Sequence, residues 1–151
     1  MNRVWIYQAD RFLTDSEVKE VGDALADFVS SWTAHGSALA GKATVRDNLF
    51  LILEVDEEQA GVTGCSIDKS VHFLKELGRR LDVDFFDRMN VAFRDRAGKV
   101  SLVSRSKFES LVKSGDVTSD TIVFNNLVQN KEQLDLQWET PFKASWHSKV
   151  F

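Results

Sequence analysis

The sequence of 151 residues has little of several residue types that mark large classes of protein. It holds one cysteine, Cys65, so the chain cannot form an internal disulfide, and a lone thiol fits a reducing compartment. The longest apolar run, Leu49-Phe-Leu-Ile-Leu53, is too short to span a bilayer, and residues 1–8 lack the apolar region of a signal peptide. We therefore expect a soluble, cytoplasmic protein that does not insert into membranes.

Positive charge and metal-binding patterns are also scarce. A formal net charge of −4, without a block of Lys and Arg, argues against a nucleic-acid partner. One cysteine and three histidines match no standard zinc spacing. Asp82, Asp84 and Asp87 cluster but lack the glycine and terminal glutamate of an EF-hand, and we expect them to cap Phe85 and Phe86 instead. The sequence thus predicts no metal, no cofactor and no nucleic acid.

The pattern of apolar residues predicts alternating strands and helices. Expected strands cover residues 4–9, 44–46, 49–55, 89–94, 99–103 and 121–124; expected helices follow Thr14 and Thr140-Pro141 and cover residues 66–81, 106–113 and 131–136. Thr14 and Glu17 have capping-box spacing, and Asp47-Asn48 marks a hairpin turn. Single helices beside hairpins indicate an α+β layer sandwich with a largely antiparallel sheet, in the order β-α-β-β-α-β-β-α-β-α.

The chain is short enough for one domain. With one proline and eight glycines it has little material for a linker, so we expect residues 1–151 to form a single domain with a weak seam near residues 87–88. Four aromatic residues lie near the carboxyl end: Trp138, Phe142, Trp146 and Phe151. We expect them to dock on the fold rather than form a binding surface, because an exposed aromatic tail invites aggregation.

The segment 36–44 comes within one residue of the phosphate-binding loop G-x-x-x-x-G-K-[ST]. Ala43 stands where the motif needs the hydroxyl that ligates Mg²⁺. The motif also requires a strand, the loop and then a helix whose amino terminus faces the phosphates. Here a predicted helix precedes the loop and a predicted strand follows it. We therefore expect a loop leading into a hairpin and judge ATPase activity unlikely.

Cys65 is the position where residue type and location together point to chemistry. It follows Gly64 at the predicted start of a helix, where the first backbone N–H groups lack intrahelical partners and favour negative charge. A thiol there can serve as a nucleophile, with the Gly64–Ser66 amides stabilising an oxyanion. His35, in a glycine-bounded loop, is the expected base. His72 is seven residues from Cys65, about 10 Å by helical rise.

Two other interpretations of this segment stay open. A free cysteine is often a buried small hydrophobe, and Ser66 or Asp68 can simply cap the helix. The same residues can also line a ligand pocket, formed by the His35 loop together with Gly64, Ser66, Asp68 and His72. Asp68 would oppose a thiolate, although its carboxylate could orient a histidine.

Three groups of segments carry a resemblance to a known family. They are Val4-Trp-Ile-Tyr-Gln8; Ser31-Trp-Thr-Ala-His-Gly36 with Gly64-Cys-Ser-Ile-Asp-Lys-Ser-Val-His-Phe73; and Asp120-Thr-Ile-Val-Phe-Asn-Asn-Leu-Val128 with Ser145-Trp-His147. Together they resemble an uncharacterised family of small bacterial proteins, mainly from the Bacteroidetes, sometimes labelled ABC-transporter ATPases. The resemblance covers essentially the whole chain and implies a bacterial source but no mechanism.

Residues 108–124 carry a second, fainter resemblance. A helix, Gly115 and then Asp120-Thr-Ile-Val-Phe124 are similar to bacterial GYF-like modules, although the Gly-Tyr-Phe signature itself is absent. This resemblance implies peptide binding by the carboxyl-terminal half.

The sequence as a whole favours a non-enzymatic cytoplasmic protein that binds a protein partner or a small-molecule ligand. The alternative is a thiol-dependent enzyme that uses Cys65 as nucleophile and His35 as base. An enzyme requires a histidine within hydrogen-bond reach of the thiol in an accessible, concave site. A binding protein instead predicts an inert thiol and an exposed apolar or aromatic patch, for example on the last fifteen residues.

Overall fold

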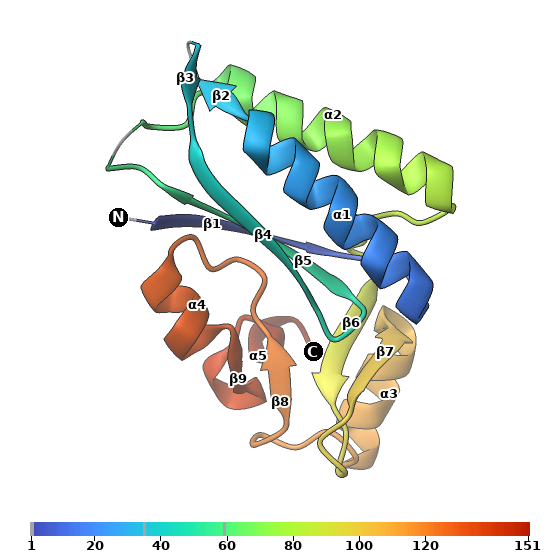
Figure 1. Cartoon of the computed structure of the whole chain (residues 1–151). Coiled ribbons are helices and arrows are strands. Elements are labelled where there is room, and N and C mark those ends of the chain that lie inside the picture. Colours follow the sequence, from blue (N-terminus) through green and yellow to red (C-terminus); the bar gives the residue numbers. More distant parts are fainter. Residues whose placement is uncertain (1, 35, 59) are drawn as a thin grey trace. The chain divides into compact units, whose positions relative to one another are not determined.

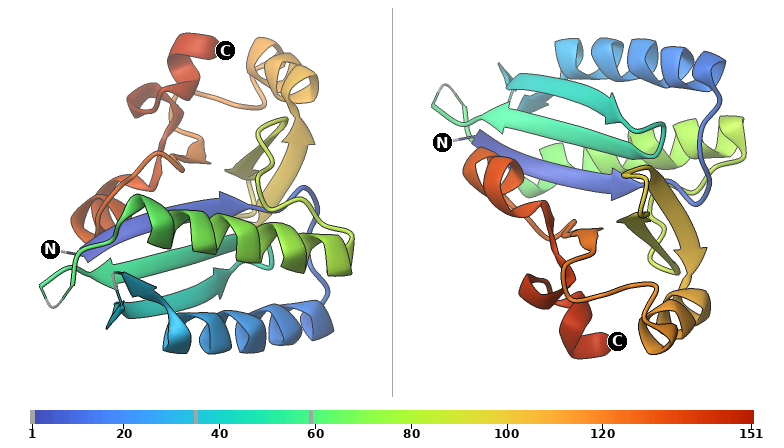
Figure 2. Two further views of the ribbon diagram at one scale, coloured as in Figure 1. Left: turned by 90° about the horizontal axis from the view of Figure 1, so that it is seen from above. Right: turned by 90° about the horizontal axis from the view of Figure 1, so that it is seen from below.

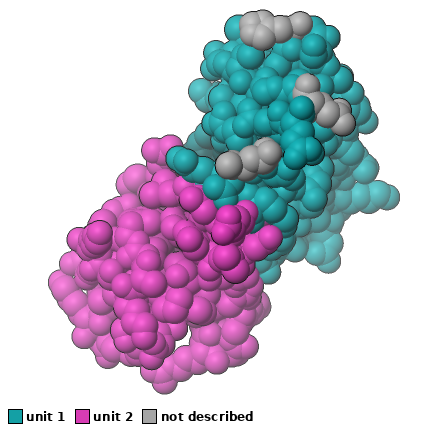
Figure 3. Space-filling view, turned by 90° about the vertical axis from the view of Figure 1, so that its left-hand side faces the viewer, with its two compact units in different colours: residues 1–87, 129–131 teal, residues 88–128, 132–151 magenta. Residues whose placement is uncertain are grey.

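The computed structural model describes residues 2–34, 36–58 and 60–151 and shows an α+β protein with antiparallel sheets, so the predicted fold class is confirmed (Figure 1). The chain forms two compact units (Figure 3). Unit 1 contains residues 1–87 and 129–131, and unit 2 contains residues 88–128 and 132–151. The number of domains stays a prediction.

Unit 1 is built on a three-stranded antiparallel sheet. Its strands are β1 (Asn2–Gln8), β4 (Ala40–Arg46) and β5 (Phe50–Asp56), in the order β1-β5-β4. The central β5 is the continuously apolar segment, and each of its residues 50–55 is at most 5% exposed. Asp47 and Asn48 join β4 to β5 with φ angles of 56° and 53°, as a type I′ turn requires. The predicted hairpin is therefore confirmed.

Two long helices cover one face of this sheet (Figure 2). Helix α1 (Asp15–Ser31) begins in the predicted capping box, and α2 (Gly64–Leu81) follows β5. Trp5 of β1 packs edge-on against Trp32 at the end of α1, and Tyr7 lies beside Ser70 of α2. Alternate residues of a strand point to the same side, so both helices lie over the same face. Phe28 and Phe73 stack at 4.6 Å and join the helices.

Unit 2 has a four-stranded antiparallel sheet in the order β7-β6-β8-β9. Its elements are β6 (Asn90–Arg94), β7 (Val100–Ser104), α3 (Arg105–Ser114), β8 (Ile122–Phe124), α4 (Lys131–Gln137), β9 (Glu139–Pro141), a 3-10 turn (Phe142–Ala144) and α5 (His147–Val150). Phe142 and Phe151 pack against a core that includes Phe93 and Phe108. The prediction that the aromatic tail docks is confirmed for these two residues.

Three short strand segments differ from the predicted elements. Strands β2 (Thr33–Ala34) and β3 (Ser37–Ala38) form a small hairpin within the expected loop. The expectation that Thr140-Pro141 opens a terminal helix is wrong, because these residues belong to β9. Pro141 pairs with Ile122 in the outermost strand, where a missing N–H does not interrupt the sheet. Phe142 and Trp146 therefore do not share a helix.

Gly78 of α2 lies unusually close to the chain that follows the helix. A β-carbon there would stand 2.4 Å from the carbonyl oxygen of Val83, whereas a β-carbon at Gly22 of α1 would meet nothing within 4 Å. We predict that Gly78→Ala lowers the free energy of unfolding by about 2–3 kcal/mol, the range for overpacking a tight site. The control Gly22→Ala should leave it unchanged or raise it by up to about 1 kcal/mol. Urea unfolding measures both, and equal effects of the two substitutions would contradict this account.

Candidate functional site

The predicted thiol region lies at the amino terminus of α2. The helix begins at Gly64, two residues before the predicted start, because Thr63 is its N-cap. Cys65 is exposed, so the interpretation of this cysteine as a buried small hydrophobe is wrong. The backbone N–H groups of Gly64 and Cys65 are among the first of the helix and have no intrahelical acceptor.

Ser66 stabilises the amino terminus of α2 through hydrogen bonds. Its Oγ accepts a hydrogen bond from the Thr63 N–H at 2.7 Å, and its own N–H donates to Thr63 Oγ1 at 3.2 Å. The indole Nε1 of Trp32 donates to the Ser66 carbonyl at 2.8 Å. Ser66 is fully buried and links the start of α2 to the core, so its N–H is already used. Thr63 rather than Ser66 or Asp68 is the N-cap.

The residues expected to act with the Cys65 thiol are His35, Asp68 and His72. His35 lies outside the residues that the structure describes. Asp68 and His72 are both exposed on α2. Asp68 shares a helix face with Cys65, whereas His72 is about 10 Å further along the helix axis. The described residues therefore provide an accessible thiol without a base beside it.

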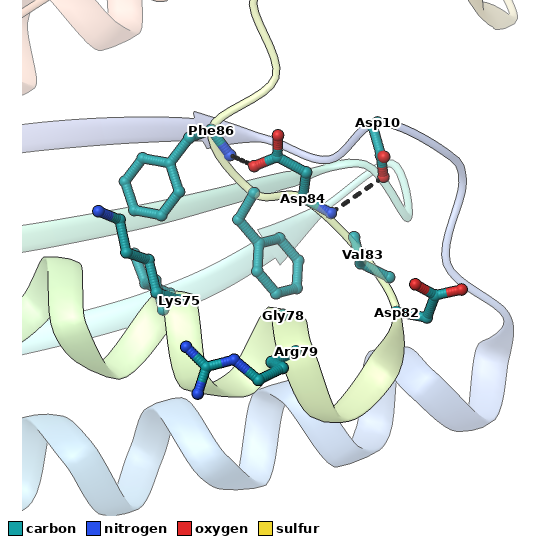
Figure 4. A pocket seen from close by; sticks show the side chains of 10 residues that line it. Asp10, Lys75, Gly78, Arg79, Asp82, Val83, Asp84 and Phe86 are labelled. Carbon is teal, nitrogen blue, oxygen red and sulfur yellow. Dashed lines mark hydrogen bonds between the residues drawn. The ribbon is translucent and has the colours of Figure 1, made fainter.

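A pocket of about 400 Å³ lies along the carboxyl-terminal half of the same helix (Figure 4). It is lined by Asp10, Leu74, Lys75, Gly78, Arg79, Asp82, Val83, Asp84, Phe85 and Phe86. All of these residues belong to unit 1. None of them belongs to the set predicted from the sequence as a site.

The chain after α2 is held in place by its backbone. Asp82 adopts the left-handed conformation with φ 55°, and the N–H groups of Asp82 and Val83 both donate to the Gly78 carbonyl. The Asp84 N–H then donates to Asp10 Oδ1 at 3.1 Å, and the Asp10 N–H donates to the Asp84 carbonyl at 3.0 Å. Because of these bonds the wall opposite the helix is formed before any ligand arrives.

The pocket has walls of opposite charge. Figure 4 shows Lys75 and Arg79 on the helix, Asp82 and Asp84 on the chain that follows it, and Asp10 on the segment after β1. The ammonium of Lys75 stands 5.9 Å from the ring centroid of Phe86 and has no ion-pair partner in the described part of the chain. Asp10 and Asp84 each use one carboxylate oxygen to accept a backbone N–H, which leaves the other oxygen available to a ligand.

A second, larger cavity of about 730 Å³ lies within unit 2. Leu111, Val117 and Ile122 give it an apolar lining, and they come from the segment that resembles GYF-like modules. Its charged rim is largely paired within the unit: Arg96 lies 3.6 Å from Asp116, and Lys143 lies 2.9 Å from Asp120. The pocket beside α2 therefore offers more unpaired charge to a ligand.

Sequence reasoning missed the α2 pocket for a physical reason. Lys75 and Arg79 have the pattern of a solvated helix face, and the aspartates were expected to cap Phe85 and Phe86. That expectation is met at Asp84, whose Oδ1 accepts from the Phe86 N–H at 2.8 Å, and Phe85 is 1% exposed. The one available signal was Gly78, a glycine inside an otherwise well-formed helix, which marks a close approach of another chain segment.

Comparisons with protein-family models, with curated proteins and with solved structures found no match. In the described part of the chain no helix is both long and apolar enough to cross a membrane. Within the same residues no cluster of three or more His, Cys, Asp or Glu side chains is arranged to hold a metal ion. The site must therefore be interpreted from its own geometry.

A buried histidine in unit 2 provides a separate observation. His147 is 3% exposed; its Nδ1 lies 2.6 Å from Ser145 Oγ, and its ring packs near Phe108. Burial, with the nearby Arg105 guanidinium, lowers the pKa of His147 to about 4. The imidazole is therefore neutral in the folded protein at neutral pH.

The exposed position of Cys65 leads to the first prediction for this site. The native chain should react with one equivalent of a thiol reagent such as 5,5′-dithiobis(2-nitrobenzoate) without denaturant, since no part of the fold has to open first. The variant Cys65→Ser should not react at all. Reaction that occurs only after urea is added would contradict the exposed placement.

The pKa of His147 leads to a second prediction. Because its pKa in the fold lies below the ordinary value of about 6.5, the unfolded chain binds more protons between these two pH values. The stability that this histidine contributes is complete above pH 6.5 and is lost as the pH falls toward 4, by up to about 3 kcal/mol. Urea unfolding between pH 7 and pH 4.5 should show this loss, and His147→Gln should remove most of it. An unchanged slope in that variant would count against the assignment.

Proposed function

We propose that the protein is a non-enzymatic cytoplasmic binding protein and that its ligand site is the pocket beside α2. The observation that carries this proposal is a preformed cavity lined both by three carboxylates and by Lys75, whose ammonium lies over the Phe86 ring without an ion-pair partner among the described residues. The volume of about 400 Å³ falls within the range of small-molecule pockets, roughly 300–1,000 Å³. A bacterial source and a cytoplasmic location belong to the same proposal.

The composition of the lining favours binding over catalysis. Its titratable side chains are one lysine, one arginine and three aspartates, with no thiol, imidazole or hydroxyl group among the lining residues. Asp10 and Asp84 also accept backbone hydrogen bonds, which hold their carboxylates in place. Fixed charges of both signs hold and orient a ligand, and the lining lacks a histidine, the most frequent general acid–base residue.

A second candidate function is favoured by one observation. Cys65 is exposed at a helix start with unpaired N–H groups, which suits a thiol-dependent enzyme that uses His35 as its base. Position alone does not supply the base that such chemistry needs. We therefore rank this function below ligand binding.

ATPase activity receives no support from the segment that resembles a phosphate-binding loop. Gly41 and Lys42 lie within strand β4, so no helix amino terminus follows them. The Lys42 ammonium instead lies 2.9 Å from a carboxylate oxygen of buried Glu54 on the neighbouring strand. A lysine engaged in the sheet in this way is poorly suited to bind a nucleotide phosphate.

The proposal is tested with a small aromatic anion, 3-phenylpropanoate. Titrated into the ¹⁵N-labelled chain, it should shift the backbone amides of Lys75, Gly78, Asp84 and Phe86, with a dissociation constant on the order of 1 mM for a ligand this small. Lys75→Gln should weaken binding at least severalfold, because the anion loses its counter-ion.

The matched control is Lys69→Gln, which removes a lysine of the same helix that does not line the pocket. Binding to this variant should equal that of the unaltered chain. If the anion shifts no amide around the pocket, or if both substitutions weaken it equally, the pocket is not the ligand site.

A further inference from the structure

We infer that the α2 pocket selects small zwitterions with an apolar body, of which a free α-amino acid with an apolar side chain is the simplest. This inference rests on the proposed function and names the ligand class of the same site. It is carried by the juxtaposition of two basic side chains, three carboxylates and an apolar floor in one cavity.

The basic wall suits a carboxylate. Lys75 and Arg79 are four residues apart on α2, so they share one face of the helix. The guanidinium fork can donate two parallel hydrogen bonds to a carboxylate, while the ammonium supplies a point charge. Arg79 has an exposed partner one turn back, Glu76, and an exposed pair of this kind is weak enough for a ligand to displace.

The acidic wall suits an ammonium group. Asp82, Asp84 and Asp10 lie where α2 ends, and the carbonyl end of a helix adds partial negative charge. Arg11 also approaches this wall: its guanidinium donates to both carboxylate oxygens of Glu17 at 2.8 Å and to the Leu81 carbonyl at 2.9 Å, and its charge interacts with Asp10 and Asp82. Because Arg11 and Glu17 together carry no net charge, the three carboxylates keep a net attraction for an incoming cation.

The floor between the walls suits an apolar body. Leu74, Val83 and Phe85 are buried there, and half-buried Phe86 presents its ring beside Lys75. Tyr7 holds that ring edge-on, with centroids 5.3 Å apart and planes at 72°. An apolar or aromatic ligand side chain can pack on this ring without moving it.

A ligand with a single charge matches only one wall. An anion that reaches Lys75 and Arg79 also approaches three carboxylates, and a cation that reaches the carboxylates approaches two basic groups. A zwitterion gives each wall its counter-ion at once. The charge pattern therefore discriminates by ligand charge, whereas the floor discriminates by apolar character.

The test compares three probes that share one aromatic body: L-phenylalanine, 3-phenylpropanoate, which lacks the ammonium group, and 2-phenylethylammonium, which lacks the carboxylate. Amide shifts of the intact ¹⁵N-labelled chain give each dissociation constant. We expect L-phenylalanine to bind about tenfold more tightly than either analogue, which corresponds to about 1.4 kcal/mol.

A substitution in the acidic wall makes the test specific. Asp82→Asn keeps a residue that accepts the left-handed conformation, so the fold is retained. It should reduce the advantage of L-phenylalanine over 3-phenylpropanoate severalfold. The control Asp23→Asn, on the exposed face of α1 and outside the pocket, should leave that advantage unchanged.

The outcomes separate the two proposals. If 3-phenylpropanoate binds at the pocket and L-phenylalanine binds no better, the zwitterion inference is overturned while the binding site stands. If none of the three probes shifts the amides around the pocket, both proposals fail together. A preference for L-phenylalanine that survives Asp82→Asn would overturn the role of the acidic wall.

Discussion

The close approach between the Val83 carbonyl and Gly78 is the constraint on which the pocket beside α2 depends. Since no β-carbon fits between them, the chain leaving the helix folds directly back along it. That return buries Phe85 beneath the helix and aligns Asp82 and Asp84 as a wall opposite Lys75. A larger side chain at position 78 would push this wall outward, and the two sets of charges would no longer face one cavity.

Helix α2 is also held in place by contacts far from its carboxyl end. The Ser66 carbonyl accepts a hydrogen bond from the Trp32 indole at the amino terminus, and Phe73 stacks on Phe28. The backbone that carries Lys75 and Arg79 therefore has little freedom to shift. Only the flexible ends of these two side chains must become ordered when a ligand binds, which limits the entropy lost on binding.

The features that could be predicted from the sequence are those with local causes. The capping box at Thr14 and Glu17 and the turn at Asp47-Asn48 each arise from neighbouring residues, and β5 begins with four consecutive apolar residues, 50–53. Strands β2, β3 and β9 have two or three residues each, too few to show a periodicity. Strands β2 and β3 pair only with each other, and β9 exists because β8, elsewhere in the chain, completes its hydrogen bonds.

The Cys65 region and the α2 pocket differ in the same way, because the first has a local cause and the second does not. Cys65 could be found because its chemistry is visible in one residue and its neighbours. The pocket could not, because Asp10 lies more than sixty positions before Lys75 in the sequence and only the fold brings them together. Each of these residues, taken alone, has an ordinary surface explanation. Only the fold, which places basic and acidic side chains around one cavity, indicates that they form a ligand site.

Asp82 is the residue that best distinguishes a ligand site from a merely stable helix end. The left-handed position after a helix is most often glycine, with asparagine next, and the carbonyl end of a helix disfavours negative charge. Stability alone would therefore favour glycine or asparagine, yet the chain carries an aspartate there with φ 55°. Three cations offset this cost: Arg79 and Arg80 of the last turn, and Arg11, which donates to the Leu81 carbonyl at 2.9 Å. An ammonium group bound against the end of α2 would give the Asp82 carboxylate a further counter-ion, which a stable helix end alone does not require.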